Sequence, residues 1–577
     1  MTSVAEQIVT ALADLGVTEV WGVVGDALNP ITDAIRTDGR IHWVGVRHEE
    51  TAAFAASGQA QISGRLGVCM GTVGPGSIHL LNGLYDASKS HAPVLAICGQ
   101  VPLTEHGSDY FQEVDNDLLF TDVATFRATV TAPSQMPRLL RQAVNAAYAR
   151  PGVAVLTIPG DVGDLEVPTD EPIRFVTRRP TLVPDTAASE EAVQMIDAAK
   201  RVTILAGRGA ITERDALLAL ADRLSAPMVL TLKAKEGLED DNPFEVGQSG
   251  LIGNPASKVA FDGADLLLML GTDFPYPEWL PEGTPTIQVD RDGTHIARRT
   301  PVDLGVIADV GPTLAAMVDR VAVKTDRDHL DEARKTYLEW QERQQAIVDP
   351  DAPGEPLAAR LLAKARSVAE NPSDAIRPEV LASVIDEVAA DDAVFTSDTG
   401  MSTVWLSRFI RFRGRRRLIG SYNLGSMANA MPQALGIQAL DRSRQVVALC
   451  GDGGLTMLLG DLLTAASEGL PIRIVVFDNS RLGMVKLEQE QVGMPEFGTV
   501  LANPDLAAVA RAMGLAAWRV EDPDDLTATL HEAFAAKGPS LVDVITNPDE
   551  VALPPHANVH QAWGFAIAKV KENLSSP

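Results

Sequence analysis

The sequence has few cysteines, no long uncharged apolar run and a deficit of basic residues. Its three cysteines, Cys69, Cys98 and Cys450, lie in or at the ends of apolar segments without metal-ligand spacing, which predicts buried, reduced thiols in a cytosolic protein. No uncharged run reaches about 18 residues, and the N-terminus lacks the basic and apolar regions of an export signal. The 49 basic residues against 77 acidic ones, a net charge of −28, argue against nucleic acid or an anionic membrane surface as the main partner.

A chain of 577 residues is too long for one hydrophobic core, and apolar strands alternate with helical patterns along it. This predicts an α/β protein of three doubly wound parallel-sheet domains. The expected segments are a first domain (1–170), a Pro-rich linker (168–184), a central domain (185–325), a charged helical linker (326–375), a third domain (376–553) and a C-terminal tail (554–577).

Short apolar runs mark the expected strands. They are 20–24, 66–72, 93–98 and 153–158 in the first domain, 202–206, 228–232, 266–270 and 286–289 in the central domain, and 446–450 and 472–477 in the third. Residues 66–76 run from a strand through glycines into a helix, as residues 446–460 do, which indicates two similar domains. The Gly207-Arg-Gly209 sequence lacks the third glycine of a dinucleotide fingerprint and is a weak signal.

Two expected strands of the third domain end in oxygen-bearing side chains. One runs into Gly451-Asp-Gly-Gly454, and the other ends in Asp478-Asn479. Ligands gather at the carboxyl ends of parallel strands, helix N-termini favour phosphates, and Mg²⁺ prefers oxygen ligands. Asp452 and Asn479 are therefore typical of a magnesium–diphosphate clamp, and 479 − 452 = 27 positions suits one crossover helix and a strand. Taken singly, either motif could be an ordinary turn.

This pair resembles the thiamin diphosphate motif, in which GDG is followed about two dozen residues later by Asn. The resemblance implies that Asp452, Asn479 and the main-chain carbonyl of Arg481 bind Mg²⁺, which holds the cofactor's diphosphate. The family usually has two asparagines where this chain has Asp478-Asn479, so the ligand position is intact. Further cofactor contacts are implied for Gly453, Gly454, Ser480, Leu482, Gly483 and Val485.

The segment Arg47-His-Glu-Glu-Thr51 precedes a helix of small residues and matches the family's activating glutamate at Glu49. In the family this carboxylate shares a proton with N1′ of the aminopyrimidine, and the resulting imino group removes the C2 proton of the thiazolium. Glu49 and Glu50 could alternatively be first-turn acids stabilised by the helix dipole.

The segment 423–429 matches the family's contacts beneath the cofactor. Gly425, Ser426 and Met427 would contact the pyrimidine, with the Met427 side chain wedging a V-shaped conformer, although a core methionine is the alternative. From the first domain, Gly25 and the turn 74–76 with His79 would line the site. His79 and His106 could each be ordinary histidines.

Along essentially the whole chain the resemblance is strongest to the pyruvate oxidase branch, particularly the bacterial quinone-linked pyruvate dehydrogenases. Phe111 and Gln112 match residues near the substrate. In that branch the central domain holds FAD, and Asp290, at a strand end, suits a ribose hydroxyl. The implied FAD contacts are Ser249, Gly250, Leu251, Ile252, Thr272, Asp273, Phe274, Pro275, Tyr276 and Asp290.

The reaction implied is the oxidative decarboxylation of pyruvate to acetate and CO₂, with electrons passing through FAD to a quinone. The cofactor would lie between domains of two subunits, so a dimer is the minimum and a homotetramer is expected. The expected location is the cytoplasm, with at most peripheral contact at the inner face of the membrane. An acetolactate synthase, a phosphate-dependent oxidase and a non-catalytic cofactor-binding protein are the alternatives.

Two departures limit the likeness to the quinone-linked enzymes. Met484 occupies a position where the best-known of them has a Phe implicated in electron transfer, and Leu-Gly-Met-Val is also how acetolactate synthases read there. The chain also ends at Pro577, without the amphipathic extension through which that relative binds lipid.

Overall fold

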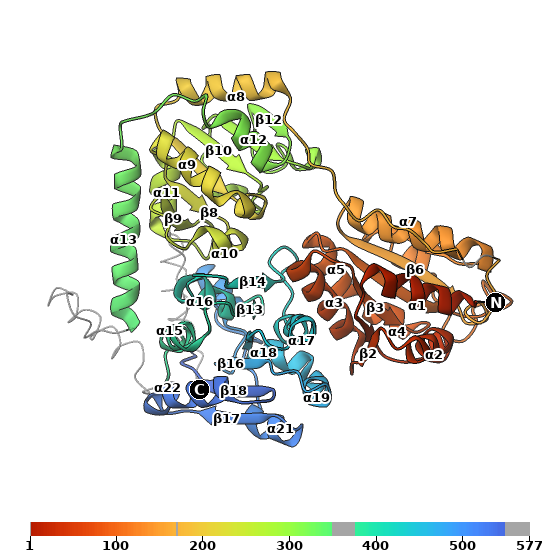
Figure 1. Cartoon of the computed structure of the whole chain (residues 1–577). Helices are drawn as coiled ribbons and strands as arrows, with labels where there is room; N and C mark the ends of the chain where they lie inside the picture. The colour runs from red at the N-terminus through yellow and green to blue at the C-terminus, as the bar shows by residue number, and fades with distance from the viewer. Residues whose placement is uncertain (1, 169–170, 349–374, 549–577) are drawn as a thin grey trace.

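The computed structural model describes residues 2–168, 171–348 and 375–548. They form three six-stranded parallel sheets with flanking helices (Figure 1), which confirms the predicted α/β class. Each sheet and its helices are called here the first, middle and third domain. The predicted 554–577 tail lies outside the described residues. Within the described residues, no helix combines the length and apolar composition that a bilayer crossing requires.

The first domain has the strand order β2-β1-β3-β4-β6-β5. The strands are β1 (Glu19–Gly22), β2 (His42–Gly45), β3 (Gly67–Gly71), β4 (Val94–Gln100), β5 (Ala124–Thr129) and β6 (Val153–Pro159). The helices are α1 (Val4–Leu15), α2 (Asn29–Asp38), α3 (Glu49–Ser63), α4 (Pro75–His79), α5 (Leu81–Lys89), α6 (Asn116–Leu119) and α7 (Met136–Ala149).

The third domain repeats this topology, with the order β14-β13-β15-β16-β18-β17. The strands are β13 (Val394–Ser397), β14 (Arg417–Gly420), β15 (Val446–Gly451), β16 (Arg473–Asp478), β17 (Ala516–Val520) and β18 (Ser540–Ile545). The helices are α15 (Pro378–Val388), α16 (Met401–Phe409), α17 (Ala430–Leu440), α18 (Asp452–Met457), α19 (Leu462–Ser467), α20 (Gly483–Gln491), α21 (Leu506–Ala512) and α22 (Pro523–Ala535). The similarity that the sequence indicated between 66–76 and 446–460 is therefore topological: β3–α4 and β15–α18 occupy the same place in the two sheets.

The middle domain has a different order, β12-β11-β10-β7-β8-β9. Its strands are β7 (Val202–Ala206), β8 (Met228–Leu230), β9 (Glu245–Gln248), β10 (Leu266–Leu270), β11 (Thr286–Asp290) and β12 (Leu304–Ile307), and its helices are α8 (Thr186–Ala198), α9 (Arg214–Leu224), α10 (Lys235–Leu238), α11 (Pro255–Asp262) and α12 (Val310–Met317). This is the doubly wound order of dinucleotide-binding sheets, whose switch point lies between β7 and β10. Helix α13 (Asp328–Val348) follows and packs on α11.

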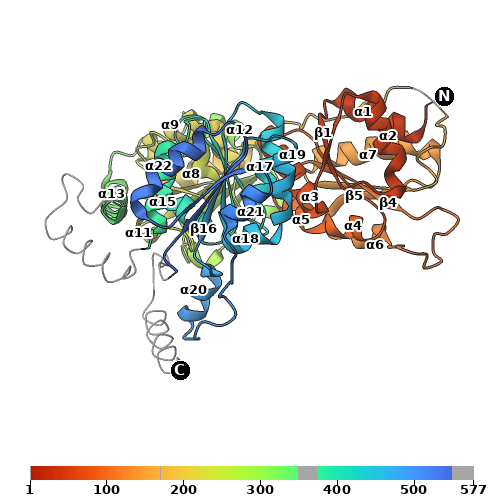
Figure 2. The same cartoon turned by 90° about the horizontal axis from the view of Figure 1, so that it is seen from below.

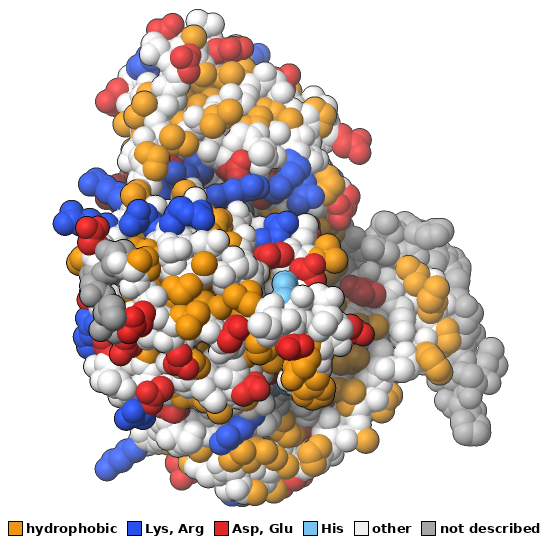
Figure 3. All heavy atoms as spheres, turned by 90° about the vertical axis from the view of Figure 1, so that its right-hand side faces the viewer, with side chains coloured by type: hydrophobic (Ala, Val, Ile, Leu, Met, Phe, Trp, Pro, Cys, Tyr) orange, Lys and Arg blue, Asp and Glu red, His pale blue; other side chains and the backbone are white. Residues whose placement is uncertain are grey.

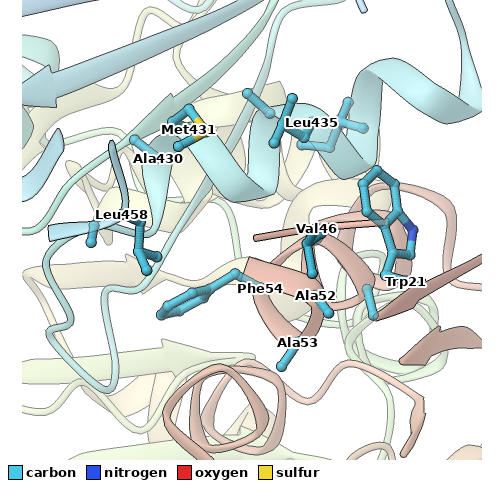
Figure 4. Close-up of a cluster of buried hydrophobic side chains, with 14 of the residues drawn as sticks. Trp21, Val46, Ala52, Ala53, Phe54, Ala430, Met431, Leu435 and Leu458 are labelled. Atoms are coloured by element: carbon cyan, nitrogen blue, oxygen red, sulfur yellow. The ribbon is translucent and has the colours of Figure 1, made fainter. Parts of the chain in front are cut away.

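The first and third domains pack together through α3 and α17, the helices that follow the second strand of each sheet. Small residues allow the close approach: a Cβ added to Gly58 would lie 2.8 Å from the carbonyl oxygen of Gln433. Figure 4 shows Phe54 and Ala52 of α3 in one apolar cluster with Met431 and Leu435 of α17. The two domains therefore share one hydrophobic core.

Two buried carboxylates reinforce this interface from opposite sides. Asp86, on α5, accepts hydrogen bonds from Gln433 Nε2 (2.9 Å) and Ser57 Oγ (2.7 Å). Asp461, before α19, accepts from the main-chain N–H of Arg47 (2.7 Å) and from Thr51 Oγ1 (2.7 Å). Burial raises the pKa of both carboxyls.

Charge is unevenly distributed over the surface. Although the protein carries a net charge of −28, one face has a band of basic side chains (Figure 3). The three cysteines are buried and unpaired, as the sequence predicted.

Candidate active site

Glu49 begins α3, directly after the loop that follows β2. His48 caps the helix, since its Nδ1 accepts from the main-chain N–H of Glu50 at 3.2 Å. The Glu49 side chain is buried, and its Oε2 lies 2.9 Å from Nδ1 of His79. His79 ends α4, and its ring stacks on that of His48 with centroids 4.5 Å apart. The first domain thus presents one buried carboxylate held by an imidazole.

The start of α3 also reaches the third domain of the same chain. Asn82 Nδ2 donates to Glu50 Oε1 at 2.8 Å and to Ser426 Oγ at 3.0 Å. Ser426 belongs to the loop 421–429, in which Gly425 has φ +80° and Ala428 φ +63°. Within one chain, the structure therefore brings this loop close to α5 and to the acidic start of α3.

Asp452 and Asp478 lie side by side at the carboxyl edge of the third sheet. Asp452 begins α18 after β15, Asp478 ends β16, and the strands pair in register at Gly451 and Phe477. Asn503 Nδ2 donates to Asp452 Oδ2 (2.6 Å) and Asp478 Oδ1 (3.0 Å). Burial, and secondarily the charge of Asp478, raise the pKa of Asp452 to about 7. A divalent cation would relieve this repulsion, so the donor set fits Mg²⁺.

Asn479 follows in a tight turn. Its Oδ1 accepts from the main-chain N–H of Arg481 at 3.0 Å, and Ser480 has φ +53°. The Arg481 side chain turns away to Glu496 at 3.0 Å, so only its main-chain carbonyl suits the role expected from the sequence.

Three predicted cofactor-binding segments meet above β15. A Cβ added to Gly453 would lie 2.8 Å from Leu482 Cδ2 and 3.4 Å from Met427 Cε, while Gly483 lies beside the Asn479 amide. Gly454 lies against the carboxylate of Asp398. The sequence-distant loops 425–428, 451–454 and 479–483 therefore meet at one edge of the third sheet.

Asp398 and Asn503 were missed by sequence reasoning. Asp398 directly follows β13 and is buried; its Oδ1 accepts from the main-chain N–H of Ala430 at 2.9 Å, and its Oδ2 has no hydrogen-bond partner among the described residues. Burial raises its pKa to about 7. An acid at the end of an apolar strand was the signal used for Asp452, and it applies equally to Asp398. Nothing in the sequence around Asn503 indicates its contact with Asp452.

The other predicted site residues differ in exposure and in contacts. Phe111 is 80% exposed, and Gln112, with φ +67°, lies against Gly74. Gly25 packs directly on Thr72 between the ends of β1 and β3. Met484 packs against the third-domain core, while the neighbouring Val485 is exposed.

At the switch point of the middle sheet, the loops that follow β7 and β10 come into backbone contact. Gly207, after β7, lies against the carbonyl of Gly271, after β10, and a Cβ on Gly209 would lie 2.9 Å from Gly271 Cα. Gly207 and Gly209 are thus placed where a dinucleotide binds, although their sequence pattern was weak. This arrangement fits FAD.

The predicted FAD-contact residues line the same edge. A Cβ added to Gly250 (φ +96°) would lie 3.5 Å from ring atoms of Phe274 and Tyr276. Asp290 ends β11 and accepts from the N–H of Asp292 (2.8 Å), with His295 Nδ1 at 3.2 Å, while Asp273 pairs with Arg298. The remaining predicted contacts, Ser249, Leu251, Ile252, Thr272 and Pro275, occupy the loops after β9 and β10.

Comparisons with known proteins agree with this architecture. Models of the thiamine pyrophosphate enzyme N-terminal TPP binding, central and C-terminal TPP binding domains match residues 2–119, 189–317 and 398–544. A putative thiamine pyrophosphate-containing protein of Bacillus subtilis, YdaP, is 36% identical over 98% of this chain and 96% of its own length. A pyruvate oxidase of Lactiplantibacillus plantarum is 31% identical (94% and 88% covered), and an acetolactate synthase of Mycobacterium bovis 30% (95% and 89%). The chain therefore belongs to the thiamine pyrophosphate-dependent enzyme family.

Proposed function

We propose that this protein oxidises pyruvate, with water as co-substrate, to acetate and CO₂ on thiamin diphosphate, Mg²⁺ and FAD, and passes two electrons and two protons to a quinone. The observation that carries the proposal is the position of the middle sheet's switch point. The β8–α10 side of that sheet is joined to the third domain, where Arg417 Nε pairs with Glu236 at 2.8 Å and Lys235 Nζ donates to the carbonyl of Ile410 at 2.8 Å. A dinucleotide there would lie beside the thiamin site.

In this proposal, some residues bind the cofactor and its metal ion, and one residue carries a proton. Asp452, Asn479 and the Arg481 carbonyl would hold Mg²⁺, and Gly425 and Met427 would hold the pyrimidine. Glu49 would keep a proton at N1′, with His79 fixing the carboxylate orientation at 2.9 Å. When bound, thiamin diphosphate supplies the electron sink for loss of CO₂. Phe111 and Gln112 would approach the substrate.

The test is anaerobic. Purified protein with thiamin diphosphate, Mg²⁺ and pyruvate is followed at the visible absorbance of oxidised flavin. Bleaching that a quinone analogue reverses, with acetate as the product, is the expected result. A protein without flavin, or one that stays yellow and forms no acetate, contradicts the proposal.

Acetolactate synthesis is the second candidate, because Leu482-Gly-Met-Val485 reads as it does in acetolactate synthases. A flavin that stays oxidised while acetolactate accumulates would establish it. Acetyl phosphate formed only with added phosphate would instead identify a phosphate-dependent oxidase.

We also propose a cytoplasmic homotetramer in which the first domain of one chain faces the third domain of another. Exposed apolar residues at both carboxyl edges support it: Ile78 and Phe111 on the first domain, and Val485 and Phe497 around α20, which projects from the third (Figure 2). Light scattering should give four chains, and a monomer in the presence of cofactors would contradict the arrangement.

A further inference from the structure

Two cations of the middle domain converge on one residue of the first domain. Arg208 follows β7, and its Nη1 donates to the carbonyl of Ser90 at 2.9 Å; Lys233 follows β8, and its Nζ lies 3.5 Å from Ser90 Oγ. Both side chains therefore stand over the carboxyl edge of the middle sheet, next to the switch point between β7 and β10. Asn423 of the third domain donates to Lys89 beside them at 2.9 Å, so three domains meet here.

The positive charge at this junction is not neutralised locally. Within the described residues no carboxylate lies in ion-pair distance of the Lys233 ammonium; Asp86 and Glu236 act on it only through space. Burial, and secondarily the charge of Arg208, lower the pKa of Lys233 to about 8. Burial also lowers the pKa of His91 to about 4, with His295 and Lys233 adding to the effect. An anion placed here would be stabilised.

The position of the cluster along the sheet indicates which part of a dinucleotide it meets. Asp290, suited to a ribose, ends β11 on one side of the switch point, and Lys233 follows β8 on the other. Within the described residues, the Glu236–Arg417 and Lys235–Ile410 contacts tie the β8 side to the third domain. A ring that exchanges electrons with the thiamin site must lie on that side.

We propose that Lys233, with Arg208 beside it, faces the isoalloxazine end of bound FAD and stabilises the negative charge that the ring gains on two-electron reduction. Charge near the ring nitrogens is a general means by which proteins tune flavins. The inference rests on the FAD assignment of the proposed function. No covalent step is involved, and the electron source is the 2-oxo acid of that reaction.

The experiment measures the midpoint potential of the protein-bound flavin by spectroelectrochemical titration, without substrate. In Lys233→Met the preference for the reduced flavin should fall about tenfold, which is about 30 mV for a two-electron couple. Lys233→Arg keeps the charge and should keep the wild-type potential. Lys258→Met is the matched control, because Lys258 lies on the exposed surface of α11 and pairs with Asp262.

The outcomes separate this inference from the proposed function. A wild-type protein that binds no flavin overturns both. Flavin bound at wild-type content with an unchanged potential in Lys233→Met overturns the inference alone. Should the methionine variant misfold, Lys233→Gln keeps a polar side chain that is one atom shorter and uncharged, and the same fall is expected there. Equal potentials in Lys233→Gln and the wild type overturn the proposal.

Discussion

The first and third domains have the same strand order but place their key acids at different points of the shared scaffold. In the first domain, the carboxylate starts the helix after the second strand, Glu49 on α3. In the third, the equivalent helix α17 begins at Ala430, and the acid instead starts the helix after the third strand, Asp452 on α18, where the first domain has Pro75. Under the proposed function, one scaffold would therefore present a proton carrier in one domain and a metal ligand in the other, depending on which strand end carries the acid.

The largest expected effect comes from neutralising Glu49. Glu49→Gln should lower decarboxylation about 10²- to 10⁴-fold, because a general acid–base group is lost, while flavin content and cofactor affinity stay near wild type. Steady-state turnover and thiamin diphosphate titration would be measured together. Glu50→Gln is the matched control, and its loss of turnover should be much smaller. Near-normal turnover in Glu49→Gln would contradict the role of Glu49 as a proton carrier, and with it the contrast to Asp452.

Asp452→Asn should show the converse pattern. Losing one carboxylate ligand weakens the Mg²⁺-dependent binding of thiamin diphosphate by about 10-fold or more, comparable to losses at other metal sites. Calorimetric titration with and without Mg²⁺ would measure it. An unchanged affinity would place the metal clamp elsewhere. An affinity loss in Glu49→Gln as large as in Asp452→Asn would mean that the two acids do not have separate roles.

The folding stability of the metal-free protein should depend on pH in a way that tests the crowding of acids in the third domain. Burial and Asp478 raise the pKa of Asp452 from 3.8 to about 7, so the folded state binds the proton more tightly than the unfolded state. Its contribution to stability is therefore present below about pH 4 and is lost as the pH rises towards 7. The pKa of Asp398 is also raised to about 7, so this carboxyl affects stability in the same direction. Melting temperatures should fall over this range, and less steeply in Asp452→Asn. Identical slopes in variant and wild type would contradict the repulsion between Asp452 and Asp478.

In the first and middle sheets, sequence reasoning found the four inner strands and missed the edge strands, whereas in the third sheet it also missed the inner strands β13 and β18. Strands β7 and β10 are buried on both faces and, apart from Thr203, read as apolar runs, so their bounds were predicted to the residue. Strands β2 and β12 are short, lie at sheet edges and have exposed positions, so their pattern is weak.

The candidate site divides in the same way. Asp452 and Glu49 stand at strand-to-helix junctions that local patterns mark. The contacts of Asn503 with Asp452 and of Asp398 with Gly454 join residues more than 50 positions apart, and only the fold brings these residues together. The switch-point role of Gly207 likewise depends on Gly271, which belongs to another strand.

The smallest expected effect concerns the reciprocal acids at the interface of the two domains. Asp86→Ala leaves the Gln433 amide without its hydrogen-bond acceptor, and Asp461→Ala does the same to the main-chain N–H of Arg47. Each should cost about 1–3 kcal/mol of unfolding free energy, the usual penalty for a buried donor left without its partner. Urea unfolding would measure both, with Asp262→Ala on the exposed face of α11 as the control. One acid comes from each side of the interface. Equal losses of unfolding free energy would therefore show that the two domains contribute symmetrically to stability even though they differ in chemistry. A loss confined to one variant would show that the interface is asymmetric as well.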